Sequence, residues 1–535
     1  MSKLPARALL GLFSGSALCG VAHAERPEIG AFFDLQQIAE SQLKGAGEDL
    51  VTYSEVSGNL TARIRNRRIV ASGSYRLSYR IPEVGKISRS INHDGVMRLQ
   101  ANVIEEWLST DVGAIITRSR IDPRGAAPQL NTGNPKNLTR TYSTFIQPTF
   151  AHHVGDLGFS ASYRYAYTKN ESGQTGIVIG PPLDRFDSSK SQEANLSLGM
   201  QQSALPFDWT LGAQYRRENT SNLSQHFRAL KVTGEIKQPI ADTVAVVASG
   251  GFERTETSER EALIDPLTGF PVLGKGGRFV VDPASARVLT YDMDGLIGDA
   301  GIIWKPSRRS RFEVRAGYRY GGLSVTGLAE MHPSERTGLT LILTDQVQTF
   351  GQGVSGGLAG APADLNIGQS LDPASSYQNC LFGKTAGSGR CIGGALGNAS
   401  AQAYRERAAS IIISRALREW TMSGSFGYTR RTYIDDPIDP FSLDGVVDQS
   451  FFGDISLNGQ LTRVSGVSFS FAGSLFKNGQ VGASDVVSGS FSANYYRTFG
   501  RSIRARASLA VDASKQDGIT ADVSGRAQLG MQYQF

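Results

Sequence analysis

The stretch IVASGSYRLSYRI, from Ile69 to Ile81, decides how the rest of the chain is interpreted. Counting every second residue from Ile69 gives only apolar or small side chains. The residues between them are one valine, three serines and the arginines Arg76 and Arg80. Successive side chains of a β-strand point to opposite faces, so this stretch predicts a strand with one apolar face and one cationic face.

The same alternation returns along the whole chain, and the residues differ each time. It is clearest at Met97–Val103, Leu157–Tyr167, Phe207–Tyr215, Phe312–Tyr320, Val467–Leu475 and Val523–Phe535. A period of two predicts strands, so the fold class is all-β. The expected strands run about ten to fourteen residues, which is longer than the five or six usual in soluble sandwiches and matches a tilted strand that crosses a bilayer.

These strands predict one sheet with hydrocarbon on its outside. Side chains cannot fill a ring of this many strands, so the apolar face must look outward. A sheet in lipid cannot leave an edge unpaired, so it must close on itself. We therefore expect a single closed antiparallel transmembrane β-barrel of about 22 strands, an even number between 18 and 24. The alternative is a secreted all-β repeat protein.

The expected connections differ at the two ends of the strands. Short ones fall near residues 66–68, 105–106, 152–156, 204–206, 305–310, 418–419 and 498–501, and long ones at 121–138, 170–190, 258–289, 351–402 and 431–446. Short periplasmic turns and long extracellular loops are typical of outer-membrane barrels. The tight pair Gly321-Gly322 falls on the side of the long loops, which suggests a hairpin miscounted there.

The two ends of the chain predict export to the outer membrane of a Gram-negative bacterium. Residues 1–24 combine Lys3 and Arg7, a short apolar stretch and Ala22-His23-Ala24, so we expect a secretory signal peptide cut after Ala24 and a barrel over residues 25–535. A membrane anchor fits less well, because the apolar stretch is short and broken by glycine and serine. The closing GMQYQF, with terminal Phe535, resembles the strand that the outer-membrane assembly machinery recognises.

Several longer stretches resemble one family of outer-membrane β-barrels, found beside PEP-CTERM and exopolysaccharide gene clusters. They are VTYSEVSGNLTARIRNRRIVASGSYRLSYRI at residues 51–81, RGAAP at 124–128, residues 153–169, FVVDPASARVLTYDMDG at 279–295, residues 304–322, VQTFG at 347–351 and the final GMQYQF. The resemblance implies a barrel over nearly all of the processed chain and says little about function. Some members are labelled as a preprotein translocase subunit, a name that the strand pattern does not support.

Arginines dominate the polar face of the expected strands, and we take eight of them as a candidate cationic lining of the lumen. These are Arg76, Arg80, Arg164, Arg216, Arg315, Arg319, Arg504 and Arg506. A cationic wall favours anions, and guanidinium groups bind carboxylates in pairs. The competing interpretation is that these arginines pair with lumen acids. The formal net charge of +6 falls to about +4 without Lys3 and Arg7 (6 − 2), and no basic patch typical of nucleic-acid binding is present.

Two cysteines remain after the signal peptide is removed, Cys380 and Cys391, and both fall in the longest expected loop. We expect them to form a disulfide because the compartment is oxidising. A metal or redox pair is the rival, but no histidine lies nearby and the spacing is not C-x-x-C.

The same loop is the best candidate for a plug, a constriction or a lid. It also contains Gly353-Val354-Ser355-Gly356-Gly357, a G-x-S-x-G string that we take as a chance match, because catalysis by this motif needs an α/β unit.

Two classes of function remain. The first is a passive channel for export of an acidic exopolysaccharide or another anionic solute. The second is a structural or receptor-type barrel, or a barrel enzyme. A siderophore-type receptor needs an N-terminal plug domain, whereas strand alternation here starts near Ile29. We expect no catalytic residues, no cofactor and no metal. The expected partners are outer-membrane lipid and lipopolysaccharide, the assembly machinery and a polysaccharide export complex.

Overall fold

The computed structural model describes residues 27–45, 50–128, 137–171, 173, 182–201, 205–367, 379–437, 441–480 and 482–535. The predicted signal peptide and its cleavage site at Ala24 lie outside the described residues. The elements in chain order are β1 (Glu28–Lys44), β2 (Val51–Arg65), β3 (Ile69–Val84), β4 (Ser90–Ile104), β5 (Leu108–Arg120), β6 (Leu138–Val154), β7 (Leu157–Asn170), β8 (Ser188–Met200), β9 (Asp208–Thr220), η1 (Asn222–Ser224), β10 (His226–Ala241), β11 (Val244–Arg260), η2 (Lys275–Gly277), β12 (Arg287–Ser307), β13 (Ser310–Arg319), β14 (Gly322–Ser334), β15 (Thr337–Gln348), α1 (Phe350–Ala359), β16 (Cys380–Phe382), β17 (Gly389–Cys391), α2 (Gly393–Leu396), β18 (Ala403–Ala416), β19 (Trp420–Ile434), β20 (Val447–Thr462), β21 (Ser465–Lys477), β22 (Val486–Phe499), β23 (Ile503–Gln516) and β24 (Asp522–Gln534).

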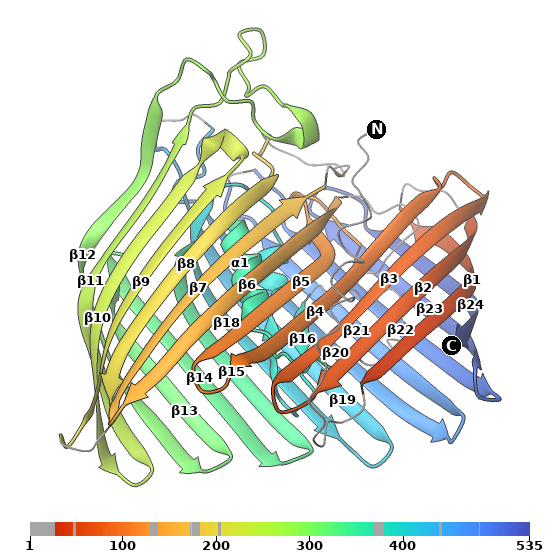
Figure 1. Cartoon of the computed structure of the whole chain (residues 1–535). Helices are drawn as coiled ribbons and strands as arrows, with labels where there is room; N and C mark the ends of the chain where they lie inside the picture. The colour runs from red at the N-terminus through yellow and green to blue at the C-terminus, as the bar shows by residue number, and fades with distance from the viewer. Residues whose placement is uncertain are drawn as a thin grey trace.

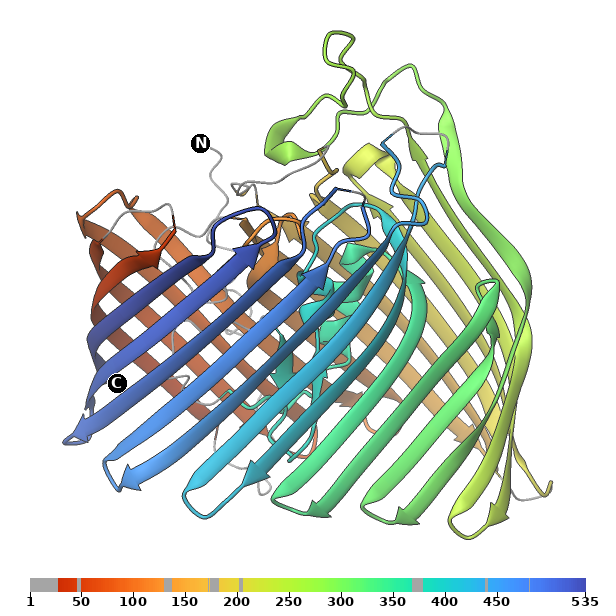
Figure 2. The same ribbon diagram turned by 180° about the vertical axis from the view of Figure 1, so that it is seen from behind.

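Most of the chain forms one antiparallel sheet of 22 strands, as the alternation predicts. Each strand pairs with its neighbour in sequence, and β1 also pairs with β24, from Phe32 opposite Gln534 to Lys44 opposite Val523. The strands therefore form a tilted ring (Figures 1 and 2). β16 and β17 are not in this ring and pair only with each other.

The ring passes directly from β15 to β18. Gln348, the last residue of β15, lies opposite Tyr404 at the start of β18. Residues 349–402 therefore leave the wall and return to it at one place, carrying α1, β16, β17 and α2 with them. In Figure 1 α1 is seen within the ring, behind the strands nearest the viewer.

The connections differ between the two ends of the ring. At the lower end in Figure 1 the strands are joined by short turns such as residues 66–68, 242–243 and 335–336, and at the upper end by long segments such as 261–286. Tyr320-Gly321 is a two-residue turn at the upper end, between Arg319 and Gly322. Both turn residues have positive φ, 53° and 72°, which is the hairpin turn that favours glycine. The tight connection is therefore real, and no hairpin was miscounted.

The outward face of the sheet is apolar. In the stretch Ile69–Ile81, Tyr75, Leu77 and Tyr79 are exposed, whereas Ser78 and Arg80 are buried. The same contrast repeats around the ring, where the exposed outward side chains include Leu211, Leu230, Val314, Phe426, Phe471, Leu509 and Leu529. An exposed apolar surface this extensive marks a surface that is covered by a nonaqueous partner. Among the described residues, no helix is both long enough and apolar enough to cross a membrane.

The strand ladder between β14 and β15 is incomplete, as is the one between β4 and β5, whose pairing begins at Gly95 opposite Ile116. β14 pairs with β13 from Gly322 onward, but its pairing with β15 starts only at Gly327 opposite Leu343. Along residues 322–326 two guanidinium groups of β18 approach the free edge. Arg405 donates to the carbonyl oxygens of Tyr320 at 3.1 Å and Leu323 at 3.2 Å, and Arg407 donates to that of Leu323 at 3.0 Å. We call this region the β14–β15 seam.

Candidate functional site

The lumen is occupied by the described parts of residues 349–402, namely 349–367 and 379–402, which we call the lumen insert. Its first helix, α1, is capped by Thr349, whose hydroxyl accepts from the backbone N–H of Gln352. Phe350, Val354 and Leu358 recur every four residues along α1 and so share one face, which is fully buried. That face packs against apolar lumen residues of β4, β5 and β6, namely Val96, Ile115 and Phe145. The insert is therefore held to the wall by an apolar core.

Arginines of β2 and β4 hold the C-terminal side of α1. Arg98 donates to the carbonyl oxygens of Ala361 and Ala359, at 3.1 Å each, and stacks over the Phe145 ring. Cationic side chains suit a helix C-terminus, where backbone carbonyls lack partners. Arg65 makes an ion pair with Asp364 at 3.1 Å. These contacts fix the insert to the β2–β4 side of the ring.

The far end of the insert is fixed to the opposite side of the ring. Arg431 of β19 donates to the carbonyl oxygens of Gly394 and Asn398. Cys380 and Cys391 face each other in the β16–β17 hairpin and are joined by a disulfide. The insert therefore reaches from β2–β4 to β18–β20 across the lumen.

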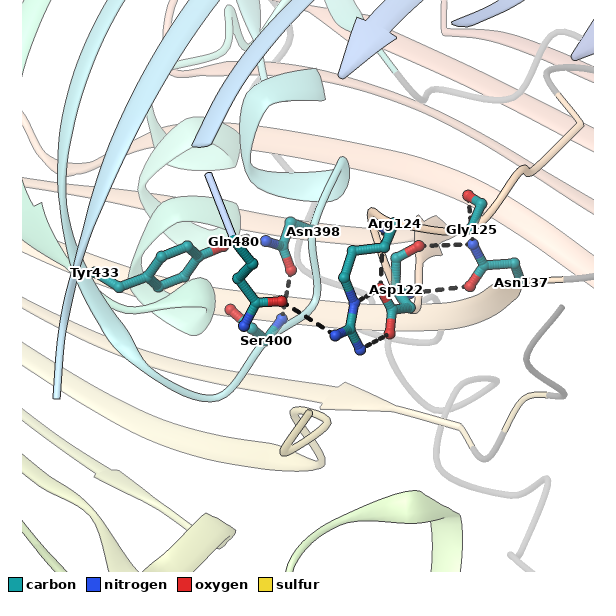
Figure 3. A network of polar contacts seen from close by, with 8 residues as sticks. All are labelled: Asp122, Arg124, Gly125, Asn137, Asn398, Ser400, Tyr433 and Gln480. Carbon is teal, nitrogen blue, oxygen red and sulfur yellow. Dashed lines mark hydrogen bonds and ion pairs between the residues drawn. The ribbon is translucent and has the colours of Figure 1, made fainter. Parts of the chain in front are cut away.

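A second segment, residues 121–128, also enters the lumen from the β5–β6 connection, and we call it the mouth segment. Arg124 is its centre and is 1% exposed. Its guanidinium binds Asp122 through two contacts, Nε to Oδ1 at 2.9 Å and Nη2 to Oδ2 at 2.7 Å, and donates to Gln480 at 3.1 Å (Figure 3). Asn137 donates to the carbonyl oxygens of Asp122 and Gly125. Because Gln480 follows β21, the mouth segment connects walls that lie far apart around the ring.

The eight arginines proposed as a lumen lining all lie on the face opposite the exposed apolar residues, and six of them pair with acids. The pairs are Arg76 and Arg80 with Glu55, Arg164 with Glu193, Arg315 with Glu235 and Glu313, Arg319 with Glu253, and Arg506 with Asp34. Arg504 donates to Thr498 and lies over the Tyr496 ring. For the six paired arginines, the structure agrees with the competing interpretation, which is pairing with lumen acids.

A cavity of about 470 Å³ lies between the insert and the wall. α1, β17 and α2 form one side, and strands from β7 to β10, from β13 to β15 and from β18 to β20 form the other. Its size is that of a small-molecule site. The charged side chains that line it are Arg164, Glu193, Arg216, Lys231, Arg319, Asp345, Arg390 and Glu406. Lys231 and Arg390 were not among the residues predicted from sequence. Lys231 could have been found from the sequence, because it lies on the polar, lumen-facing side of β10. Arg390 could not, because its contacts depend on how the insert folds.

The G-x-S-x-G string lies within α1. The Ser355 hydroxyl donates to the carbonyl oxygen of Gly351 at 2.8 Å, one helical turn earlier. A nucleophilic serine instead stands on a tight strand-to-helix turn with its hydroxyl exposed. The string is therefore a helix segment. Within the described ranges, no group of three or more His, Cys, Asp or Glu side chains is placed to bind a metal ion.

Asp184 connects the outer loops above the lumen. Its carboxylate accepts from the backbone N–H of Phe279 at 2.8 Å and from the Asn222 side chain at 2.9 Å, and its carbonyl oxygen accepts from the N–H of Ala401. Burial raises the pKa of Asp184 to about 7, because the charged form loses its solvation. Asp435 raises the pKa further, and Arg278 lowers it.

Comparison with known proteins gives a likeness in structure alone. No family model and no curated protein sequence matches the chain, so the resemblance to the PEP-CTERM-associated barrels stays an expectation. Among solved structures, the copper transporter OprC is 11% identical with a TM-score of 0.40, over 96% of this chain and 82% of that one. The open form of the ferric-catecholate import receptor Fiu from E. coli K12 is 10% identical with a TM-score of 0.47, over 96% and 82%. The alcaligin outer-membrane receptor FauA from Bordetella pertussis is 10% identical with a TM-score of 0.40, over 94% and 76%.

The location of the chain follows from its own surface. The outward side chains of the ring are apolar and exposed, and the strands of β1 to β15 and β18 to β24 are ten to twenty-one residues long. Antiparallel sheets of this kind, apolar outside and polar inside, are built for the outer membrane. The chain is therefore an outer-membrane protein of a Gram-negative bacterium, as the sequence predicts.

Proposed function

We propose that this chain is a receptor-type barrel that moves a small anionic solute across the outer membrane, with the lumen insert holding the path shut at rest. The observation that carries this proposal is the insert itself. Its described residues are bonded to Arg98 and Arg65 on one side of the ring and to Arg431 on the other. A solute must then pass beside the insert or displace it.

The same observation weighs against an always-open channel for a polysaccharide. A polymer needs a continuous path, and the insert and the mouth segment both cross the lumen. Six of the eight arginines already have carboxylate partners, which leaves less free cationic wall for an acidic polymer than the sequence suggests. We propose no enzymatic role, and we propose outer-membrane lipid, lipopolysaccharide and the assembly machinery as partners.

The proposal is tested by conductance in a planar bilayer. The wild-type chain is compared with a variant in which residues 350–401 are replaced by a short glycine linker, because Gln348 and Tyr404 are already neighbours in the ring. We expect little steady current through the wild type and large, stable currents through the variant. Equal and large currents through both would show that the insert does not block the lumen.

A further inference from the structure

The cavity between the insert and the wall has more cations than acids, and its acids are already occupied. Three carboxylates line it, and each makes an ion pair: Glu193 with Arg164 at 3.5 Å, Asp345 with Arg405 at 2.7 Å, and Glu406 with Arg431 at 3.4 Å. Of the five lining cations, Arg164 and Arg319 use the carboxylates of Glu193 and Glu253. Arg216, Lys231 and Arg390 remain.

Within the part of the chain that the structure describes, these three cations have no carboxylate within 4 Å. Arg216 donates only to the carbonyl oxygen of Val347 at 3.3 Å, and its Nε is buried without a partner. Lys231 and Arg390 make no hydrogen bond to a described residue. A cation that is removed from bulk water without a counter-charge is costly, and a bound anion relieves that cost.

The three cations approach the cavity from two directions. Arg216 lies opposite Ala229, and Lys231 lies opposite Gln214, so the two cations are diagonal neighbours on the lumen face of β9 and β10. Such neighbours lie roughly 7–8 Å apart at the backbone, within reach of one ligand for long side chains. Arg390 comes from β17 of the insert, next to Cys391 of the disulfide. A ligand held by all three would therefore join the insert to the wall.

We propose that this cavity binds a compact dianion of the phosphate or dicarboxylate type, held by Arg216, Lys231 and Arg390. Three lining cations without a carboxylate partner leave an excess of positive charge, most of which a dianion neutralises. Guanidinium groups bind such oxyanions through paired hydrogen bonds, and lysine adds a point charge. The inference deepens the proposed function, since it places the anionic solute at the face of the insert and gives its charge.

The experiment is titration calorimetry on the full chain in detergent micelles, with inorganic phosphate, succinate and uncharged glucose as probes. We expect saturable binding of phosphate or succinate, none of glucose, and at least a tenfold weaker affinity in Lys231→Met and in Arg390→Met. Arg390→Lys keeps the charge and should bind within a few fold of the wild type. Phosphate against succinate distinguishes the two ligand types.

The matched control is Lys237→Met. Lys237 lies on the same face of the same strand as Lys231, but it pairs with Asp208 at 2.5 Å and does not line the cavity. Affinity unchanged in Lys237→Met supports the site. No saturable binding to the wild type, binding that survives Lys231→Met combined with Arg390→Met, or equal weakening by the control overturns it. These binding measurements need no membrane. Absence of anion binding would therefore not change the result of the conductance test, and an insert that does not block the lumen would not change the result of the binding test.

Discussion

Arg98 offers the sharpest test of how the lumen insert is held. Its guanidinium is almost fully buried and donates to two backbone carbonyls at the end of α1, those of Ala359 and Ala361. Asp111 is the nearest acid, at 3.7 Å. We predict that Arg98→Met keeps the packing over the Phe145 ring but removes both hydrogen bonds, so the insert leaves the wall more readily.

The size of the effect follows from those two bonds. A hydrogen bond from a charged group contributes about 1.5–3 kcal/mol, so losing two costs the docked insert at least about 3 kcal/mol. Every 1.4 kcal/mol is a factor of ten, so the population with a displaced insert rises roughly a hundredfold. Single-channel recording in a planar bilayer measures this directly, as the fraction of time spent in the conducting state.

The control is Arg315→Met, which removes another lumen arginine. Arg315 pairs with Glu235 and Glu313 on the wall, and it makes no ion pair or hydrogen bond with the described residues of the insert. It should alter the ion preference of open events and leave their frequency near that of the wild type. An Arg98→Met channel that opens no more often than the wild type, while folding normally, would refute the view that these bonds hold the lumen shut.

Three further predictions address the wall, the insert and the outer loops. Leu77→Arg puts a charge on the apolar face at a cost of about 2–4 kcal/mol in mid-bilayer, so the folded fraction on semi-native gels should fall, whereas Leu267→Arg in the exposed β11–β12 connection should not change it. Replacing Cys380 and Cys391 by serine removes a cross-link over 11 residues, worth roughly 3 kcal/mol, and hydrogen exchange in the β16–β17 hairpin should quicken, as it should in reduced wild type. Burial raises the pKa of Asp184, so its contribution to loop packing is complete near pH 4 and is lost as the pH rises through about 7. Protease cleavage of the outer loops should therefore increase from pH 5 to pH 8 in the wild type and increase less in Asp184→Asn, where the pKa of Glu259, raised by burial, still gives some pH dependence.

The strands of the wall could be predicted from the sequence because the pattern that specifies them involves only residues close together in the chain. The alternation at Ile69–Ile81 correctly separates exposed Leu77 from buried Arg80, and repetition of the pattern gives the 22 strands. The short connection that conflicted with the expected pattern was predicted at Gly321-Gly322, one residue away from the observed turn at Tyr320-Gly321. Strand period and turn length are properties of neighbouring residues, so one sequence suffices to find them.

The contents of the lumen could not be predicted in the same way. Arg98 is separated by more than 260 residues from the carbonyls it binds, and Arg506 by 472 from Asp34. Whether a lumen arginine is paired depends on which strands face each other across the ring, and no local pattern reports that. The helix α1 was also missed, because its sequence FGQGVSGGLA is rich in glycine and is helical only where the lumen face of β5–β8 packs against it.

The β14–β15 seam has a consequence for the mechanics of the wall. Where the ladder is complete, parting two strands means breaking a row of backbone hydrogen bonds. Along residues 322–326 the carbonyl of Leu323 accepts from Arg405 and Arg407, so two side chains of β18, and no backbone ladder with β15, hold this stretch. Both guanidinium groups also bind Asp345, which lines the cavity. The same two side chains therefore link the unpaired edge of β14 to a residue of the cavity lining, so a change in the cavity that moves Asp345 would also loosen this edge.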